Sequence, residues 1–162
     1  MIEALLCDAI AMHIREKCDV TLPVPNRSPD GELSYVKPMV CVGYIPPKSS
    51  AVSNYSPFVL VRADGATSTR ERTSVKVSII IAVYCDEKTP DAGYVDCINL
   101  MGRVRDTLMS LPTPALDDRY ILEDGISWKT YDEQPWPRYQ IDMETTWTIR
   151  AAEHVDPHGE YM

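Results

Sequence analysis

The polar residues that follow Gly65 are of the types that surround a bound phosphate: small hydroxyl side chains, arginines and backbone N–H donors. A phosphate loop also needs several glycines, a GK[ST] lysine and the start of a helix. Here a strand rich in valine and isoleucine follows instead. The sequence therefore predicts a long polar loop between two strands, ending at Thr73. Its charged residues Arg70, Glu71 and Arg72 are either solvated or reach a neighbouring subunit.

Adjacent carboxylates occur four times and are the second candidate for chemistry, since paired carboxylates can work as acid and base in a hydrolase. Adjacent residues on a strand point to opposite faces, however, and Asp is favoured at turns for local hydrogen bonding. We therefore interpret these residues as turn residues on a surface. The pairs are Asp86-Glu87, Asp117-Asp118, Glu123-Asp124 and Asp132-Glu133.

The histidines and cysteines do not predict a metal or catalytic site. His13 falls on the apolar face of a predicted helix, which favours a packed or interface residue. His154 and His158 have ligand-like spacing, but Pro157 disfavours the helix that would bring them to one face. The five cysteines form no CxxC pair and are expected to be reduced thiols, and no serine sits in a GxSxG motif. We expect no enzyme activity, no cofactor and no metal.

The composition is that of an acidic globular domain. The 162 residues are 44% hydrophobic and 25% charged, with a formal net charge of -8, so we expect a single domain spanning 1–162. The charge argues against general nucleic-acid binding and against an anionic membrane surface, although DNA could slide past without adhering. The apolar run Ile79 to Tyr84 is too short to span a bilayer, and no secretory signal is expected.

Two helices are predicted from apolar periodicity. Residues at three- and four-residue steps give one apolar face over Ile2 to Cys18, with basic residues near the helix end. Prolines make 19–38 an irregular connection, with a short strand around Thr21 to Val24. The second helix starts at Thr89-Pro90 and runs to Leu111.

Strands are predicted in runs between the helices. The 73–84 strand is half solvated at its start and apolar on both faces further on. Asp124-Gly125 is expected to make a tight turn between two strands, and 151–162 to be a loose tail. The order predicts an α+β fold, with a single mostly antiparallel β-sheet, two helices packed on one face and a projecting β-hairpin. The predicted strands are Met39 to Ile45, Phe58 to Arg62, Thr73 to Tyr84, Arg119 to Glu123, Ile126 to Tyr131 and Tyr139 to Arg150.

Aromatic residues sit on or beside loops. Trp136 lies between two prolines, and Tyr35, Tyr44 and Tyr55 flank loops. Aromatics on rigid loops bind partners at low entropic cost, but they can equally cover the sheet. The residues alone leave both interpretations open.

Three segments in this order resemble a family of small proteins encoded in the tail modules of tailed bacteriophages and prophages, the tail terminator or tail completion proteins. The resemblance covers the chain from about Val40 to Ile149 and includes no catalytic signature. Its most specific part is the acidic run 131–134 that leads into Pro135-Trp136-Pro137. The segments are "VGYIPPKSS" with "SPFVLVRADG", "VKVSIIIAVYCDE" with "GYVDCINLMGRVRDTL", and "WKTYDEQPWPRYQIDMETTWTI".

The resemblance implies a structural role. Such proteins usually assemble as hexameric rings on the end of the tail tube, stop tube growth and present a surface to the head connector. The expected partners are further copies of the chain, the tail tube protein and the head–tail connector protein. DNA would pass through without sequence-specific binding, and no membrane is involved. The expected location is the virion tail, and the bacterial host cytoplasm during assembly.

On this basis we expect the hairpin to contact a neighbouring subunit or the tail tube. Two alternatives remain at this point: a head–tail connector component, and a small hydrolase or ligand-binding enzyme that uses carboxylates such as Asp86 and Asp91. The predicted oligomer or partner interface comprises Arg70, Glu71, Arg72, Lys76, Tyr55 and Trp136.

Overall fold

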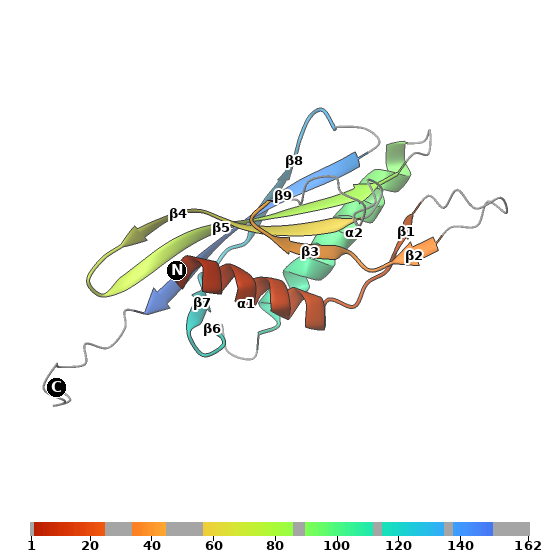
Figure 1. The fold of residues 1–162 in the computed structure, drawn as a ribbon. Helices are drawn as coiled ribbons and strands as arrows, with labels where there is room; N and C mark the ends of the chain where they lie inside the picture. Colours follow the sequence, from red (N-terminus) through yellow and green to blue (C-terminus); the bar gives the residue numbers. More distant parts are fainter. Residues whose placement is uncertain are drawn as a thin grey trace, which may run out of the picture.

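The computed structural model describes residues 2–24, 34–44, 57–85, 90–111, 115–134 and 138–150. Two helices, α1 (Ile2–Lys17) and α2 (Pro90–Met109), pack on one face of a curled β-sheet (Figure 1). The sheet is antiparallel except for one parallel pair, β3 with β4. The predicted α+β fold is therefore confirmed.

The main sheet has seven strands in the order β3-β4-β5-β9-β7-β6, with β8 also paired to β9. Strands β1 and β2 form a separate antiparallel pair within the connection that the sequence predicted to be irregular. The strands are β1 (Leu22–Val24), β2 (Ser34–Val36), β3 (Met39–Val42), β4 (Phe58–Ser68), β5 (Arg72–Tyr84), β6 (Ala115–Leu116), β7 (Tyr120–Leu122), β8 (Ser127–Thr130) and β9 (Arg138–Arg150).

The main core lies between the helices and one face of the sheet. Alternate residues of β5 and β9 point into it, as the period of two predicted. A smaller cluster of Phe58, Leu60, Ile80 and Ala82 is buried on the opposite face, which explains why the second half of β5 is apolar on both sides. Fully buried side chains of the main core include Leu6, Ile10, Ile14, Ile79, Ile81, Leu100, Leu108, Ile141, Met143, Trp147 and Ile149.

Among the described residues, the one buried polar side chain of this core is Thr145, which is 2% exposed. Its hydroxyl donates to the carbonyl oxygen of Val77 at 2.9 Å and accepts the indole N–H of Trp147 at 2.9 Å. A buried indole N–H normally has a partner, because an unsatisfied donor is costly. The hydroxyl thus lets a tryptophan pack completely inside the core while tying β9 to β5.

The expected tight turn at Asp124-Gly125 is wrong. β7 and β8 do not pair with each other: both lie antiparallel to β9, one after the other along the same edge. Gly125 has a φ of 93°, which only glycine adopts without strain. The chain passes from one strand to the next along β9 rather than reversing, because β9 is long enough to pair with both.

Candidate functional site

The β4–β5 hairpin extends beyond the helices and is the most prominent projection of the described part of the chain (Figure 1). The two strands pair from Phe58 opposite Ala82 out to Ser68 opposite Thr73. The sequence predicted the first strand to end at Arg62, with a loop as far as Thr73, and this was wrong. Small polar residues have weak strand preference by themselves, but backbone hydrogen bonds to β5 hold them in the sheet.

A β-bulge bends the hairpin at its base. The register shifts between Ala63 and Gly65, and a bulge of this kind increases the local twist of a strand. The carboxylate of Asp64, at the shift, lies 3.4 Å from Nε of Arg62 and accepts a hydrogen bond from the hydroxyl of Ser78. The direction in which the hairpin leaves the sheet is therefore fixed by side-chain contacts as well as by the backbone.

The tip is a short turn built without glycine. The N–H of Thr69 donates to the carbonyl oxygen of Arg72 at 2.8 Å. The Thr69 hydroxyl oxygen accepts the N–H of Arg72 at 3.2 Å and that of Glu71 at 3.3 Å. Among the described non-glycine residues only Asp117 and Asp118 have a positive φ. The tip is therefore unstrained, and Thr69 satisfies its backbone donors.

Four of the six predicted interface residues lie on this hairpin, and all four are exposed. None of them forms an ion pair with another residue of the described ranges. The alternation of β5 places Arg72 and Lys76 on the face away from the helices. The four are Arg70, Glu71, Arg72 and Lys76, whereas Tyr55 and Trp136 fall outside the described residues.

The hairpin is rooted in three strands rather than two. β9 pairs with β5 along its full length, from Tyr84 opposite Arg138 to Arg72 opposite Arg150. Sequence reasoning missed the role of Glu123, which it grouped with the turn carboxylates. Oε1 of Glu123 accepts the hydroxyls of Ser74 at 3.4 Å and Thr148 at 2.6 Å, so one carboxylate joins β5 and β9. No signal in the sequence marks this contact, because it depends on which strands are neighbours.

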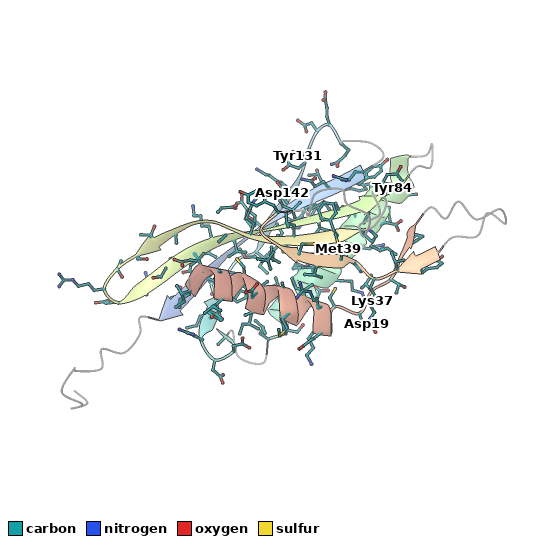
Figure 2. All side chains as sticks on the ribbon, in the orientation of Figure 1. Asp19, Lys37, Met39, Tyr84, Tyr131 and Asp142 are labelled. Carbon is teal, nitrogen blue, oxygen red and sulfur yellow. The ribbon has the colours of Figure 1, made fainter. Side chains whose placement is uncertain are left out.

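A polar network lies on the open face at the other end of β9 (Figure 2). The hydroxyl of Tyr131 donates to the carboxylate of Asp142, and this bond is the main reason why the pKa of Tyr131 is raised. The side-chain amide of Gln134 accepts the N–H of Gln140 at 2.8 Å and donates to its carbonyl oxygen at 3.3 Å. The side chain of Gln134 thus bonds the backbone of Gln140 as a neighbouring strand would, and it holds the segment 131–134 beside β9.

That segment carries the exposed carboxylates Asp132 and Glu133, and we call it the acidic corner. They lie in a bend, as the turn interpretation predicted. Asp117 and Asp118 likewise occupy a turn, each with a φ of 53°. Asp86 and Glu87 are outside the described residues. The structure therefore gives no distances there that would test the alternative of a carboxylate-based hydrolase.

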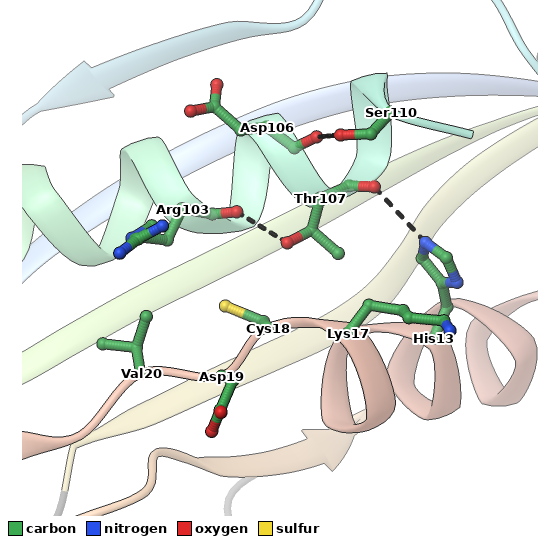
Figure 3. Close-up of a pocket in the computed structure, with 9 residues that line it drawn as sticks. All are labelled: His13, Lys17, Cys18, Asp19, Val20, Arg103, Asp106, Thr107 and Ser110. Carbon is green, nitrogen blue, oxygen red and sulfur yellow. Dashed lines mark hydrogen bonds between the residues drawn. The ribbon is translucent and has the colours of Figure 1, made fainter. Parts of the chain in front are cut away.

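A cleft of about 410 Å³ lies where the C-terminal ends of α1 and α2 approach each other (Figure 3). Its hydroxyl groups bond to the helix backbone: Thr107 donates to the carbonyl oxygen of Arg103 at 2.8 Å. Nε2 of His13 is 3.3 Å from the carbonyl oxygen of Thr107, which fits the packed role predicted for it. The lining residues are His13, Lys17, Cys18, Asp19, Val20, Arg103, Asp106, Thr107 and Ser110.

The thiols are poorly suited to nucleophilic chemistry. All five cysteines are thiols rather than members of a disulfide, and burial raises the pKa of Cys97 to about 12 and also raises that of the half-buried Cys18. A thiol is a nucleophile only as the thiolate. Within the described ranges no three His, Cys, Asp or Glu side chains gather as a metal site, and no helix is long and apolar enough to cross a membrane.

No family model matches this chain, and no curated protein matches it at a significant level.

Proposed function

We propose that the protein is a structural component of a phage tail end: a tail terminator or completion protein that forms a homo-oligomeric ring, caps the tail tube and joins it to the head connector. The observation that carries the proposal is the projecting β4–β5 hairpin, whose exposed tip presents Arg70 and Arg72 without an ion pair in the described part of the chain. The proposal that this hairpin makes a contact in a phage tail comes from the resemblance of the three sequence segments to tail terminator proteins.

A rigid projection of this kind suits an assembly contact. Binding costs less entropy when the contacting element is already ordered, and the hairpin is held by its turn, by its bulge and by β9. The net charge of -8 suits a channel for DNA, since acidic groups around a lumen repel phosphates and prevent adhesion. A lumen lined mainly by lysine and arginine would contradict this part of the proposal.

The test replaces both tip arginines by glutamate, as R70E/R72E. We expect the wild-type protein to cap tail tubes of the phage or prophage that encodes it, seen as rings at tube ends in electron micrographs. The variant should leave the tube ends bare. A matched control, K17E/R103E, makes the same change in net charge at two exposed residues of the helices and should cap normally.

Two outcomes would count against the proposal. If the wild-type protein bound purified heads and never tubes, the chain would be a connector component instead. If R70E/R72E capped tubes as the wild type does, the hairpin would have no part in the contact.

A further inference from the structure

We infer that copies of the chain join side by side in the same orientation, because the two edges of the sheet have complementary steps. Strand β3 of one copy pairs antiparallel with β8 of the next, and the part of β4 beyond β3 pairs with β6 of that next copy. The inference rests on the proposed function in that it names the contact by which a ring would form.

One edge of the sheet is recessed where the hairpin leaves the body. β3 pairs with β4 only from Phe58 to Val61, and the last bond runs from the N–H of Gly43 to the carbonyl oxygen of Val61. The outer side of β4 from Gly65 to Ser68 has no strand beside it among the described residues. This edge therefore stands out at β3 and steps back by one strand towards the hairpin tip.

The opposite edge of the sheet has the reverse step. β8 lies beside Ile141 to Glu144 of β9 and has no further strand on its outer side in the described part of the chain. Towards the tip end of β9, β7 takes the place of β8, and β6 lies outside β7 with Leu116 opposite Tyr120. This edge is therefore recessed at β8 and stands out by one strand at β6.

The two edges match in height and in facing at β3 and β8. Val42 is level with Met143 of β9, which is the residue opposite Trp128. Both side chains point to the helix side of the sheet, as the core residues Val61 and Met143 opposite them do. Val42 is 37% exposed and Trp128 is 41% exposed in the single copy. Side-by-side copies would place these two apolar side chains against each other, which favours strand pairing.

The outward backbone groups of β3 belong to Val40 and Val42. Met39 and Gly43 direct their N–H groups at carbonyl oxygens of β4, and alternate residues of a strand direct their backbone groups to opposite sides. The outward carbonyl oxygen of Val40 accepts a guanidinium N–H of Arg15 at 2.7 Å. A carbonyl oxygen has two lone pairs and can accept a second bond, so this contact leaves the edge available.

The outward backbone groups of β8 belong to Trp128 and Thr130. On β9 the backbone groups of Gln140 and Thr146 form hydrogen bonds on the β8 side, so the even-numbered residues of β9 face that side. The residues of β8 opposite them bond to β9, which leaves the other two to face outward. Antiparallel pairing sets these two residues opposite the two outward residues of β3, and each pair would exchange two hydrogen bonds.

The second step matches in the same way. Ser68 of β4 and Leu116 of β6 are both level with Ile149 of β9. β6 runs parallel to β4, because each is separated from β9 by one strand that is antiparallel to both. The small residues from Gly65 to Ser68 let another backbone approach closely. β6 of the next copy would therefore fill the recess beside β4, and no copy is turned over, so the contact closes into a ring when the rotation between copies allows it.

Opposite charges meet where the second step ends. Arg70 and Asp118 each lie two residues beyond the end of a strand, the first after β4 and the second after β6. Asp117 is exposed like Asp118, and none of the three forms an ion pair with another described residue. The remaining charge of that turn, Arg119, lies 5.8 Å from the ring centroid of Tyr120. The tip of one copy would meet two carboxylates of the next, and such charges select the partner.

A disulfide between copies tests the contact. Cys41 is level with Asp142, which is the residue opposite Lys129. In the proposed pairing Cys41 and Lys129 form a pair without hydrogen bonds, whose Cα atoms lie about 4.5 Å apart, and a disulfide can span that distance. Within one copy the two positions lie on opposite edges of the sheet. We therefore expect mild oxidation of K129C to give a ladder of linked chains on a non-reducing gel.

The matched control is C41S/K129C, which keeps the new thiol, removes its partner and should stay unlinked. An equimolar mixture of the wild type and C41S/K129C should stop at linked dimers, because each chain then supplies one half of a single link. In a separate variant, Val42→Pro removes an outward N–H that β3 does not use in its own sheet. We expect this chain to fold by circular dichroism and to associate at least about tenfold more weakly in light scattering.

The inference is overturned if K129C gives no more linked chains than C41S/K129C, or if folded Val42→Pro associates as the wild type does. The same results separate the contact from the proposed function. Rings that cap tail tubes but do not link through K129C would leave the proposed function in place and remove the contact. K129C chains that link into rings but never bind tubes would keep the contact and remove the proposed function.

Discussion

Replacing Thr145 by valine tests how the projecting hairpin is held to the core. The Thr145 hydroxyl is the partner of the Trp147 indole N–H, and the tryptophan side chain is fully buried. Valine keeps the branched shape of threonine, so packing is retained while that N–H loses its partner. A buried donor without a partner costs about 1–3 kcal/mol, and burying the new methyl group returns at most about 0.8 kcal/mol. We expect the free energy of unfolding to fall by about 1–2 kcal/mol, which is a drop in Tm of about 2–8 °C for a chain of this size.

Urea unfolding followed by circular dichroism measures this loss. Thr146→Val is the matched control: Thr146 is the next residue on the same strand, and its half-exposed side chain points to the opposite face. This change should stay within about 0.5 kcal/mol of the wild type. In a Trp147→Phe background the valine at 145 should cost less, because the donor is gone. The reasoning fails if the two valine variants are equally stable, or if the cost is unchanged in the phenylalanine background.

Three further predictions concern single sites. A Cβ on Gly93 would clash with the ring of buried Tyr139, so Gly93→Ala should cost about 1–3 kcal/mol in thermal melts. Gly102→Ala should be neutral or stabilising, because its Cβ would meet only Nη2 of Arg105 at 3.7 Å, an ordinary contact. Equal melts would contradict the close packing. Cys97, with its pKa raised to about 12, should react with a thiol-specific disulfide reagent far more slowly than the half-buried thiols, and fast labelling of the native protein would refute this. The raised pKa of Tyr131 favours the neutral phenol in the folded state, so its stabilising bond should persist below pH 10.0 and be lost as the pH rises through the raised value. Unfolding free energies of Tyr131→Phe and the wild type should converge there, and a constant difference across that range would contradict it.

The elements that bury a continuous apolar stripe could be predicted from the sequence. The apolar residues of α1 recur at helical steps, and the structure gives Ile2–Lys17 against a predicted end at Cys18. The two-sided apolar pattern of β5 correctly indicated burial on both faces. These patterns indicate which face of a helix or strand is buried, and they do so without identifying the element that packs against it.

The elements held by a neighbouring strand could not be predicted. Ala66 to Ser68 carry no strand pattern, and they are extended because β5 pairs with them. β2 and β6 were missed for the same reason, since each is a short partner of another strand. Local preference is weak for such segments, and tertiary pairing decides their conformation.

The predicted site was incomplete in a similar way. Exposed charges at the tip are visible as a run in the sequence, so Arg70, Glu71 and Arg72 were identified. Glu123 and Gln134 were not, because their roles require knowing that β5 lies beside β9 and that the chain returns to Gln140. A side chain that bonds to a neighbouring strand cannot be told from an ordinary loop residue by the sequence around it.

The backbone and the charged side chains of the hairpin would contribute differently to the association of copies. The hairpin backbone lowers the entropic cost of an assembly contact, because it is already fixed by the turn and by β9. The tip arginines are exposed and long, so they would mainly steer and select the partner. Exposed charge pairs weaken when salt shortens the screening length, whereas backbone pairing does not. Raising the salt concentration should therefore slow the association of wild-type chains more than it speeds their dissociation. The same salt series should have little effect on the association rate of a chain in which Arg70, Arg72 and Lys76 are replaced by glutamine, and an equal salt effect on both would mean that the steering charges lie elsewhere.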